Sequence, residues 1–255
     1  MSDLHGNYEA YCSMLEKINF GDEDVLYILG DILDRGPHPI KIILDLIERH
    51  NVIVLAGNHC MMACECFDFL LKEITEASIE DVDDITIRKF LNWQYNGADS
   101  TIEEFSMCDE KTRQAIIDFI SDFELYEEVQ VGGRKFILVH AGLGNFSPEK
   151  ELWEYELHEL VWERPDYNIP YFEDKYVITG HTPTQIIEGN KKPGYIYHAN
   201  NHIAIDCGCH IQKGRLACLR LDDMKEFYVE NNKKKLINLR KQQEKHYSLQ
   251  NGLAI

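Results

Sequence analysis

Residues 25–36, VLYILGDILDRG, hold the pattern that decides the fold. Their first half, Val25–Leu29, is a short apolar run of the kind that forms a buried strand, and it ends at a polar loop that contains glycine. Prolines follow that loop and open a helix predicted over Ile40–His50, because proline is tolerated in a first helical turn. A strand, a polar loop and a helix in this order are typical of layered α/β folds.

Outward from this unit the same kinds of element recur, and together they predict an α/β protein. Residues Tyr8–Asn19 have helical periodicity, and Val52–Leu55 is a second buried strand. Further along the chain, the pair Gly132-Gly133 between two β-rich runs predicts a hairpin. The strands predicted for this second half are Leu125–Val131, Lys135–Val139, Tyr176–Thr179, Tyr195–Tyr197, His202–Ile205 and Leu216–Leu221.

Residues 61–123 lie between the two β-containing halves and lack strand-like runs. Their acidic residues and the helical spacing of their apolar positions predict an insertion of about two to four helices. We therefore expect one folded domain over residues 1–230 that contains this insertion, followed by a basic, polar tail over residues 231–255.

The composition excludes several classes of protein. The chain has 255 residues, with 44 Asp and Glu against 26 Lys and Arg, which gives a formal charge of −18. Because the tail has a charge of +5, residues 1–230 have a charge of −23. Such acidity disfavours a general nucleic-acid binder, which needs a basic face. The sequence shows neither a membrane span nor a signal peptide, so we expect a cytoplasmic protein that binds no membrane and whose eight cysteines are reduced.

Five short loops combine an Asp, Asn or His with a glycine, which lets the backbone turn tightly beside a polar side chain. Carboxylate, amide and imidazole ligands suit divalent manganese, iron or zinc rather than thiolate-binding ions. The ligands are too many for one tetrahedral ion, so the sequence predicts two divalent ions that share a bridging carboxylate. The loops are DLHG at residues 3–6, GDILDRG at 30–36, GNH at 57–59, VHAG at 139–142 and GHTP at 180–183.

In this order and spacing the loops resemble the calcineurin-like metallophosphoesterases, and within them the phosphoprotein-phosphatase family of bacterial and phage type. That family has the motifs GD-x-HG, GD-x-x-DRG and GNH-E, then a histidine before Ala-Gly and a later GH-T. The corresponding positions here are Ser2–Gly6, Gly30–Gly36, Gly57–Cys60, His140 and Gly180–Thr182. The resemblance covers residues 2 to about 209 and implies a layered sandwich of two mixed β-sheets flanked by helices.

The resemblance also implies roles for the matching residues. His59 would be the general acid, and Asp34 behind it would fix its tautomer and raise its basicity. Arg35 and Asn58 would bind the substrate phosphate, and the segment LVWER at residues 160–164 suggests Arg164 as a second phosphate arginine. The implied ligands of two divalent ions, manganese first with iron or zinc as alternatives, are Asp3, His5, Asp31 (bridging), Asn58, His140 and His181.

The reaction that the resemblance implies is hydrolysis of a phosphomonoester by a metal-bound hydroxide. Two cations about 3.5–4 Å apart lower the pKa of a water that they share. The ions and the arginine forks would neutralise the phosphoryl oxygens, which permits attack in line with the leaving alcohol. No phosphoenzyme is needed, in keeping with the lack of an evident nucleophilic serine or cysteine motif.

Two positions depart from the family pattern. Cys60 stands where a glutamate follows Gly-Asn-His, which removes a polar partner and leaves a thiol that we expect to be open to oxidation. The family also has an apolar strand before the first motif, whereas only Met1 and Ser2 precede Asp3 here. We expect that the metal held by Asp3 and His5 binds weakly in the chain as it stands.

Several substrates share these motifs. The leading prediction is a protein serine/threonine phosphatase, so that the partner is a phosphoprotein or a small phosphorylated substrate. A symmetrical dinucleoside-tetraphosphate hydrolase is the alternative, and a non-catalytic phospho-binding protein is a distant one. A nuclease or cyclic-nucleotide phosphodiesterase is disfavoured, because Pro183 replaces the second histidine of their G-H-x-H motif. The acidic insertion disfavours very acidic substrates.

Overall fold

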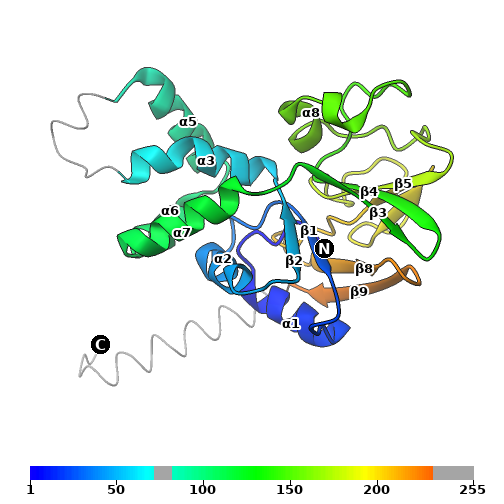
Figure 1. The fold of residues 1–255 in the computed structure, drawn as a ribbon, viewed down its shortest axis with the longest axis horizontal. Coiled ribbons are helices and arrows are strands. Elements are labelled where there is room, and N and C mark those ends of the chain that lie inside the picture. The colour runs from blue at the N-terminus through cyan, green and yellow to red at the C-terminus, as the bar shows by residue number, and fades with distance from the viewer. Residues whose placement is uncertain (72–81, 232–255) are drawn as a thin grey trace.

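The computed structural model describes residues 1–71 and 82–231, and its helices and strands confirm the predicted α/β class (Figure 1). The helices are α1 (Tyr8–Ile18), α2 (Pro39–Ile47), α3 (Asn58–Leu71), α5 (Asp84–Tyr95), α6 (Asp99–Ser106), α7 (Glu110–Ser121) and α8 (Leu157–Val161), with a 3₁₀ turn at Leu152–Glu154. The strands are β1 (Leu26–Leu29), β2 (Val52–Leu55), β3 (Tyr126–Val131), β4 (Arg134–Val139), β5 (Lys175–Thr179), β6 (Tyr197–Ala199), β7 (His202–Ala204), β8 (Arg215–Arg220) and β9 (Lys225–Glu230). The predicted tail lies outside the described residues, apart from Asn231.

The largest sheet has five strands in the order β3-β4-β5-β7-β6. Its three inner strands run parallel, and its two edge strands pair antiparallel with their neighbours. The other described strands form a parallel pair, β1-β2, and an antiparallel pair, β8-β9. The described strands thus form three sheets where the sequence predicted two, because β1 and β8 are separated by a cavity instead of being hydrogen-bonded.

The predicted strands and helices are present, most with ends shifted by one to three residues, and two differences have local causes. Strand β6 begins at Tyr197, whereas the prediction began at Tyr195, because Asn200 and Asn201 form the two-residue turn to β7 with φ of 49° and 62°. A turn of this kind needs positive φ at both positions. Strand β9 was not predicted, since the charged residues at its ends hide the apolar centre that packs beside α1.

Four described helices, α3, α5, α6 and α7, cover the segment predicted as a helical insertion. Aspartates start two of them: Asp83 accepts from the backbone at the start of α5, and Asp109 accepts from Thr112 at the start of α7. Their aromatic residues meet in the core, where Phe67 stacks on Phe105 with ring centroids 5.1 Å apart. Among the described residues, no helix has the length and apolarity that a membrane crossing requires.

The N-terminal residues lie along β1 and continue its sheet by a single residue. The ammonium of Met1 donates to the carbonyl of Tyr27 at 2.9 Å, and the N–H of Leu29 donates back to the carbonyl of Met1 at 2.9 Å. The next loop then follows the course of the loop after β1, since the N–H of His5 donates to the carbonyl of Asp31. Two loops that are distant in sequence are thereby held side by side.

Candidate metal centre

The predicted site residues gather where parallel strands end. Asp31 follows β1, Asn58 follows β2, His140 follows β4 and His181 follows β5. The carboxyl ends of parallel strands are the edge at which α/β proteins bind ligands. The loop of residues 3–6 reaches the same edge through its hydrogen bonds to the loop after β1.

The backbone at this edge is unusual. Left-handed φ values in non-glycine residues cost about 1–2 kcal/mol each and gather at functional sites. Gly30, with φ of 75°, packs so tightly that a Cβ there would collide with the ring of His140. The predicted site residues with left-handed backbone are Asp3 (51°), His5 (43°), Asp31 (49°), Asp34 (66°), Arg35 (65°) and His181 (58°).

The Asp31 carboxylate lies at the centre of two groups of potential metal ligands. One group is His5, Asp31 and His59, and the other is Asp31, His140 and His181, each with ligand atoms within 4.8 Å of one another. Oδ2 of Asp31 lies 3.8 Å from Nε2 of His5 and 3.5 Å from Nε2 of His140. These separations exceed those of direct hydrogen bonds and match two ligands of one ion, since each metal–ligand bond is about 2 Å long.

The hydrogen bonds of the histidines prepare them as ligands. Nδ1 of His5 donates to the carbonyl of Leu33 at 2.9 Å, and Nδ1 of His140 donates to the carbonyl of Leu29 at 2.8 Å. A donor bond at Nδ1 fixes the tautomer and directs the Nε2 lone pair at a metal. The donor set of carboxylate, amide and imidazole therefore fits divalent ions of the manganese, iron and zinc type.

The amide oxygen of Asn58 completes the second group. It lies 3.0 Å from Nε2 of His140 and 2.9 Å from Nδ1 of His181. The predicted ligand Asp3 lies at the edge of this group, where its carboxylate accepts from the backbone N–H of His181 at 3.0 Å. The six predicted ligands thus lie together; His59 also lies in the first compact group, whereas Asp3 lies outside both.

Charges at the site are set by burial and by neighbouring groups. Burial disfavours charge on His140, yet Asp31 beside it raises the pKa of this ring to about 9. Burial, together with the charges of His140 and Arg164, lowers the pKa of His181 to about 3. Burial and the Asp206 carboxylate hold the pKa of Asp3 well above its ordinary value. Without metal, His140 therefore carries the proton that compensates Asp31.

A buried network holds His59 from behind. Its Nδ1 donates to Oδ2 of Asp34 at 2.6 Å, and both side chains are completely buried. Trp93 on α5 donates to the same oxygen at 2.8 Å, while the Thr101 hydroxyl on α6 donates to Oδ1 at 2.6 Å. The sequence analysis missed Trp93 and Thr101, because a tryptophan and a threonine at helical spacing have the appearance of ordinary core residues.

The arginine of the same loop lies over the first group of ligands. Arg35 donates to Nε2 of His59 at 2.7 Å and to Nε2 of His5 at 2.9 Å, so it occupies the lone pairs that would face a metal. His210, which matched no motif, stacks edge-on against His5 and lies 3.4 Å from Arg35. Arg164 is exposed at the rim of the site, where its charge acts on His181.

A further buried acid was also missed. Asp206 follows β7, and its carboxylate accepts from the N–H of Gly208 at 2.8 Å. Burial, reinforced by the nearby Asp31, raises its pKa from 3.8 to about 6. The sequence did offer one signal for this acid: Asp206 comes two residues after the apolar end of a strand, Ile203 and Ala204, as other site residues do.

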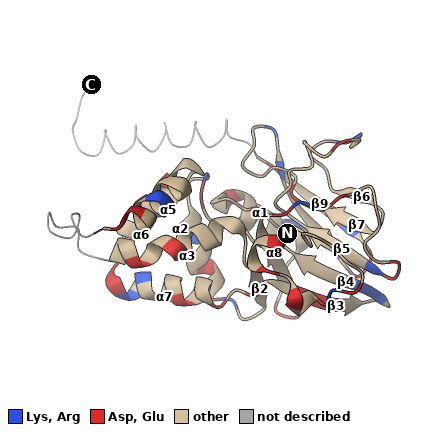
Figure 2. Ribbon diagram, turned by 90° about the horizontal axis from the view of Figure 1, so that it is seen from above, with Lys and Arg blue, Asp and Glu red and all other residues tan. Residues whose placement is uncertain are grey.

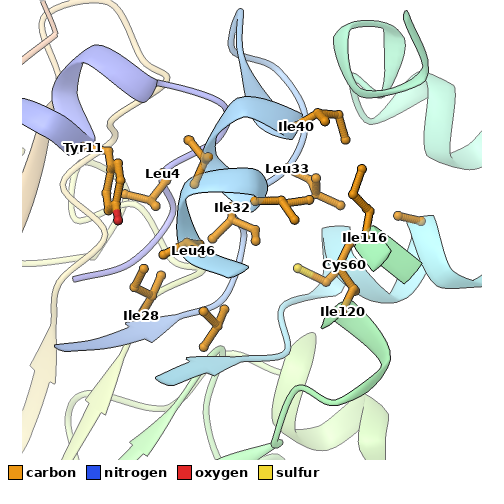
Figure 3. Packing of buried hydrophobic residues seen from close by; sticks show 14 of the residues in the cluster. Leu4, Tyr11, Ile28, Ile32, Leu33, Ile40, Leu46, Cys60, Ile116 and Ile120 are labelled. Atoms are coloured by element: carbon orange, nitrogen blue, oxygen red, sulfur yellow. The ribbon is translucent and has the colours of Figure 1, made fainter. Parts of the chain in front are cut away.

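The expectation that Cys60 is open to oxidation is wrong. Its side chain is completely buried in the core beside Ile116 and Ile120 (Figure 3). Burial raises the pKa of this thiol, and only the thiolate reacts readily with oxidants. The residue that replaces the family's glutamate is therefore a core residue, and all eight cysteines are free in the structure.

Comparison with known proteins places these features in a family. A family model described as calcineurin-like phosphoesterase matches residues 1–214. The chain is 24% identical to an asymmetrical bis(5'-nucleosyl)-tetraphosphatase PrpE from Anoxybacillus flavithermus, over 90% of this chain and 92% of that protein. It is 26% identical to the PrpE protein of Bacillus cereus that carries the same description, over 90% and 92% of the two chains.

Solved structures share the fold at low sequence identity. A protein serine/threonine phosphatase from Saccharomyces cerevisiae aligns with a TM-score of 0.56 and 12% identity, over 90% of this chain and 77% of that chain. A metallophosphoesterase from Sphaerobacter thermophilus aligns with a TM-score of 0.52 and 15% identity, over 90% and 85%. With a family model that spans most of its length, the chain belongs to the calcineurin-like phosphoesterase family.

Proposed function

We propose that the chain hydrolyses a phosphate ester or anhydride at the edge formed by Asp31, with His59 as the general acid. The observation that carries the proposal is the buried Asp34–His59 pair. Nε2 of His59 lies 4.0 Å from Oδ2 of Asp31, which is at the centre of the site. An imidazole held by a carboxylate is the arrangement used to move a proton at a reacting centre.

The residues divide the work as follows. Divalent ions held by Asp3, His5, Asp31, Asn58, His140 and His181 would supply an activated water and neutralise phosphoryl charge. Arg35 leaves His5 and His59 for the phosphoryl oxygens, with which its fork can pair bidentately. Asn58 contacts the same phosphate, and Arg164 approaches it from the rim.

The bond changes are simple. A new P–O bond forms to the water oxygen while the P–O bond to the leaving group breaks. A His59 ring protonated at Nε2 gives that proton to the departing oxygen, the attacking water releases one proton to solvent, and Nδ1 keeps its hydrogen bond to Asp34 throughout. Asp34 then holds the ring in place for the next proton, since two further donors fix the carboxylate.

We infer that dinucleoside tetraphosphates are the first substrate class to test. Relatives that align over nine-tenths of this chain are described as bis(5'-nucleosyl)-tetraphosphatases. These proteins are described as asymmetrical, whereas the sequence analysis considered the symmetrical reaction, so the products of this chain must be identified directly.

A phosphoserine or phosphothreonine protein is the second candidate, supported by charge. Helices α3 and α6 carry acidic residues and no basic ones: Glu65, Asp68, Asp99, Glu103 and Glu104 (Figure 2). The net charge of the chain, −18, repels a polyphosphate and attracts a basic peptide. This charge pattern favours a phosphopeptide with basic residues beside the phosphate.

One experiment compares the two classes and tests the mechanism. Turnover of diadenosine tetraphosphate and of a basic phosphoserine peptide is measured with manganese, for the protein and for His59→Asn. We expect the variant to lose about 100-fold or more in kcat on the phosphopeptide, since general acid catalysis contributes 10²–10⁴-fold. The loss on the dinucleotide should be smaller, because a nucleotide phosphate, with a second pKa of ~6, leaves without protonation far more readily than an alkoxide.

Metal binding provides the control. His59→Asn should bind manganese with unchanged stoichiometry, as measured by calorimetry, because His59 is placed as an acid and not as a ligand. The Asp31→Asn variant should lose both manganese binding and turnover. Unchanged turnover by His59→Asn on both substrates contradicts the proposed mechanism. If the native protein turns over neither substrate, the proposed function is contradicted.

A further inference from the structure

A histidine that belongs to none of the sequence motifs lies inside the candidate metal centre. His210 is part of the connection between β7 and β8. Its ring packs edge-on against the ring of His5, with centroids 4.5 Å apart, and its Nε2 lies 3.4 Å from an amino nitrogen of Arg35. The reaction proposed above gives this ring no part, so its contact with Arg35 needs a separate explanation.

The Arg35 side chain shares its hydrogens among three imidazole rings. It donates to Nε2 of His59 at 2.7 Å, to Nε2 of His5 at 2.9 Å and to Nε2 of His210 at 3.4 Å. A guanidinium has five N–H donors and no acceptor, so each ring nitrogen that faces it is the acceptor. The hydrogen of a neutral His210 ring therefore lies on Nδ1.

Two of these three bonds are incompatible with the proposed reaction. Nε2 of His5 would direct its lone pair at a metal, and Nε2 of His59 carries the proton that goes to the leaving group. Neither nitrogen can then accept a hydrogen from Arg35. Among the imidazoles that contact Arg35 in the described part of the chain, His210 is the one that can still accept.

A different loop holds the other end of the Arg35 side chain. The backbone N–H of Arg35 donates to the carbonyl of Gly97 at 2.8 Å, and its Nε donates to the carbonyl of Asn96 at 3.3 Å. Gly97 has a φ of 102°, and a Cβ there would lie 2.9 Å from Cγ of Arg35. One bond at Nε lets the planar fork rotate about it, whereas a second bond at an amino nitrogen fixes the plane.

The backbone on both sides of His210 is held in place. Nδ2 of Asn231 donates to the carbonyl of Cys209 at 2.6 Å and to the carbonyl of Ile211 at 3.3 Å. The carbonyl of Ile211 also accepts from the N–H of Gly214 at 2.9 Å. The ring of His210 thus extends toward Arg35 from a loop whose own position is set by several hydrogen bonds.

From these contacts we propose that His210 is a positioning residue for Arg35. When the hydrogens that face His5 and His59 pass to the phosphate, Nε2 of His210 keeps an outer hydrogen of the fork. The guanidinium plane is then held where two parallel N–H bonds reach two phosphoryl oxygens. This inference deepens the proposed function and rests on it in one respect, namely that Arg35 binds the phosphate.

Two variants of equal side-chain length test the role of the acceptor. The terminal oxygen of Gln in His210→Gln lies as many bonds from Cβ as Nε2 of histidine does, so it can accept from Arg35. His210→Met has the same length and ends in a methyl group. Both variants lose the ring that packs on His5, so the difference between them isolates the hydrogen bond to Arg35.

The measurement is calorimetric titration of the manganese-loaded protein with inorganic phosphate. We expect His210→Met to weaken phosphate binding about 10-fold, as for loss of one hydrogen bond to a charged group. His210→Gln should stay within about threefold of the native protein. Equal losses in the two variants would show that ring packing, and not the hydrogen bond, matters, and would overturn the proposal.

A double variant tests whether His210 acts through Arg35. Arg35→Ala should weaken phosphate binding, and adding His210→Met should change the affinity by less than about twofold further, because nothing is left to position. Losses that multiply would place His210 on the phosphate itself and overturn the proposal. Unchanged phosphate binding by Arg35→Ala would overturn it as well.

Manganese titration separates this role from metal binding. Both His210 variants should bind manganese with the native stoichiometry and with affinity within about threefold, because His210 supplies no ligand. A lower manganese stoichiometry in either variant would assign the ring to the metal and overturn the proposal. None of these measurements needs turnover. The expected phosphate pattern without turnover would contradict the proposed hydrolysis and support the positioning role.

Discussion

Single residues set the charge balance of the site, and Asp206 shows how. Its carboxyl is completely enclosed, close to Asp3 and Asp31, and accepts a hydrogen bond from Gly208. Three acids that share a buried site cannot all ionise without counter-charge. Without metal, the site therefore retains protons that the unfolded chain would release.

The first prediction concerns the substitution Asp206→Asn in the metal-free protein. The folded pKa is about 6 and the unfolded value is 3.8, so the folded state binds the extra proton between these values. Stability from this group is therefore complete below pH 3.8 and is lost as the pH rises to about 6. Asn keeps the acceptor without the charge, and should stabilise the protein at pH 8 by roughly 2–3 kcal/mol.

The measurement is thermal unfolding in chelator at pH 4 and pH 8. The variant should gain roughly 5–10 °C in Tm over the native protein at pH 8 and much less at pH 4. An equal gain at both pH values would show that packing, and not the buried charge, is responsible.

The site residues divide into those that the sequence predicts and those that it does not. Asp31, His59 and His140 are predictable, because each lies in a short motif with glycine at a strand end. Trp93 and His210 are not, because their partners are 59 and 175 residues away in the chain and no spacing pattern connects them. Long-range hydrogen bonds to a motif residue leave no local signature.

At the scale of elements, the helices between β2 and β3 support the candidate site. Helices α5 and α6 contribute the two donors, Trp93 and Thr101, that fix the Asp34 carboxylate behind His59. Apolar spacing in the sequence predicts that helices form here. It does not show which distant side chains those helices contact. Helices α5 and α6 therefore support the candidate site through the side chains of Trp93 and Thr101.

The second prediction concerns these two positioning residues. Trp93→Phe and Thr101→Val each leave an oxygen of Asp34 with one donor fewer, so the ring of His59 loses its fixed orientation. We expect kcat to fall about 10–100-fold, the range for partners behind a functional group, with KM unchanged within about twofold. Steady-state kinetics on whichever of the two candidate substrates the protein turns over separates the two constants.

Thr101→Ser is the matched control, because it keeps the hydroxyl and should retain kcat within about threefold of the native value. If Ser and Val reduce kcat equally, the effect comes from packing of α6 and not from the hydrogen bond. A rise in KM with constant kcat would instead place these residues in substrate binding.

At the scale of the molecule, the formal charge of −18 acts on every substrate that approaches. At the site, Arg35 and Arg164 contribute positive charge, as would the ions that the site would hold. Beyond a Debye length, which falls from about 30 Å at 0.01 M to about 8 Å at 0.15 M ionic strength, the acidic surface is screened. Salt therefore changes the approach of charged substrates without altering the buried chemistry.

The third prediction uses this dependence. Raising the ionic strength from 0.01 M to 0.15 M should lower KM for diadenosine tetraphosphate by about two- to fivefold, because repulsion is screened. KM for a basic phosphopeptide should rise by a similar factor. Kinetics at fixed manganese with sodium chloride as the variable tests both, and an uncharged peptide context is the control. Shifts of the same sign for the two substrates would contradict an electrostatic origin.

The left-handed backbone of the site loops has a consequence for engineering. Asp3, His5, Asp31 and His181 each adopt a conformation that glycine or asparagine adopts more readily. A screen for thermal stability alone, carried out in chelator, should therefore select Gly or Asn at these positions. Such variants would become more stable while losing their ligands, so any stabilisation of this scaffold has to be selected with the metal present.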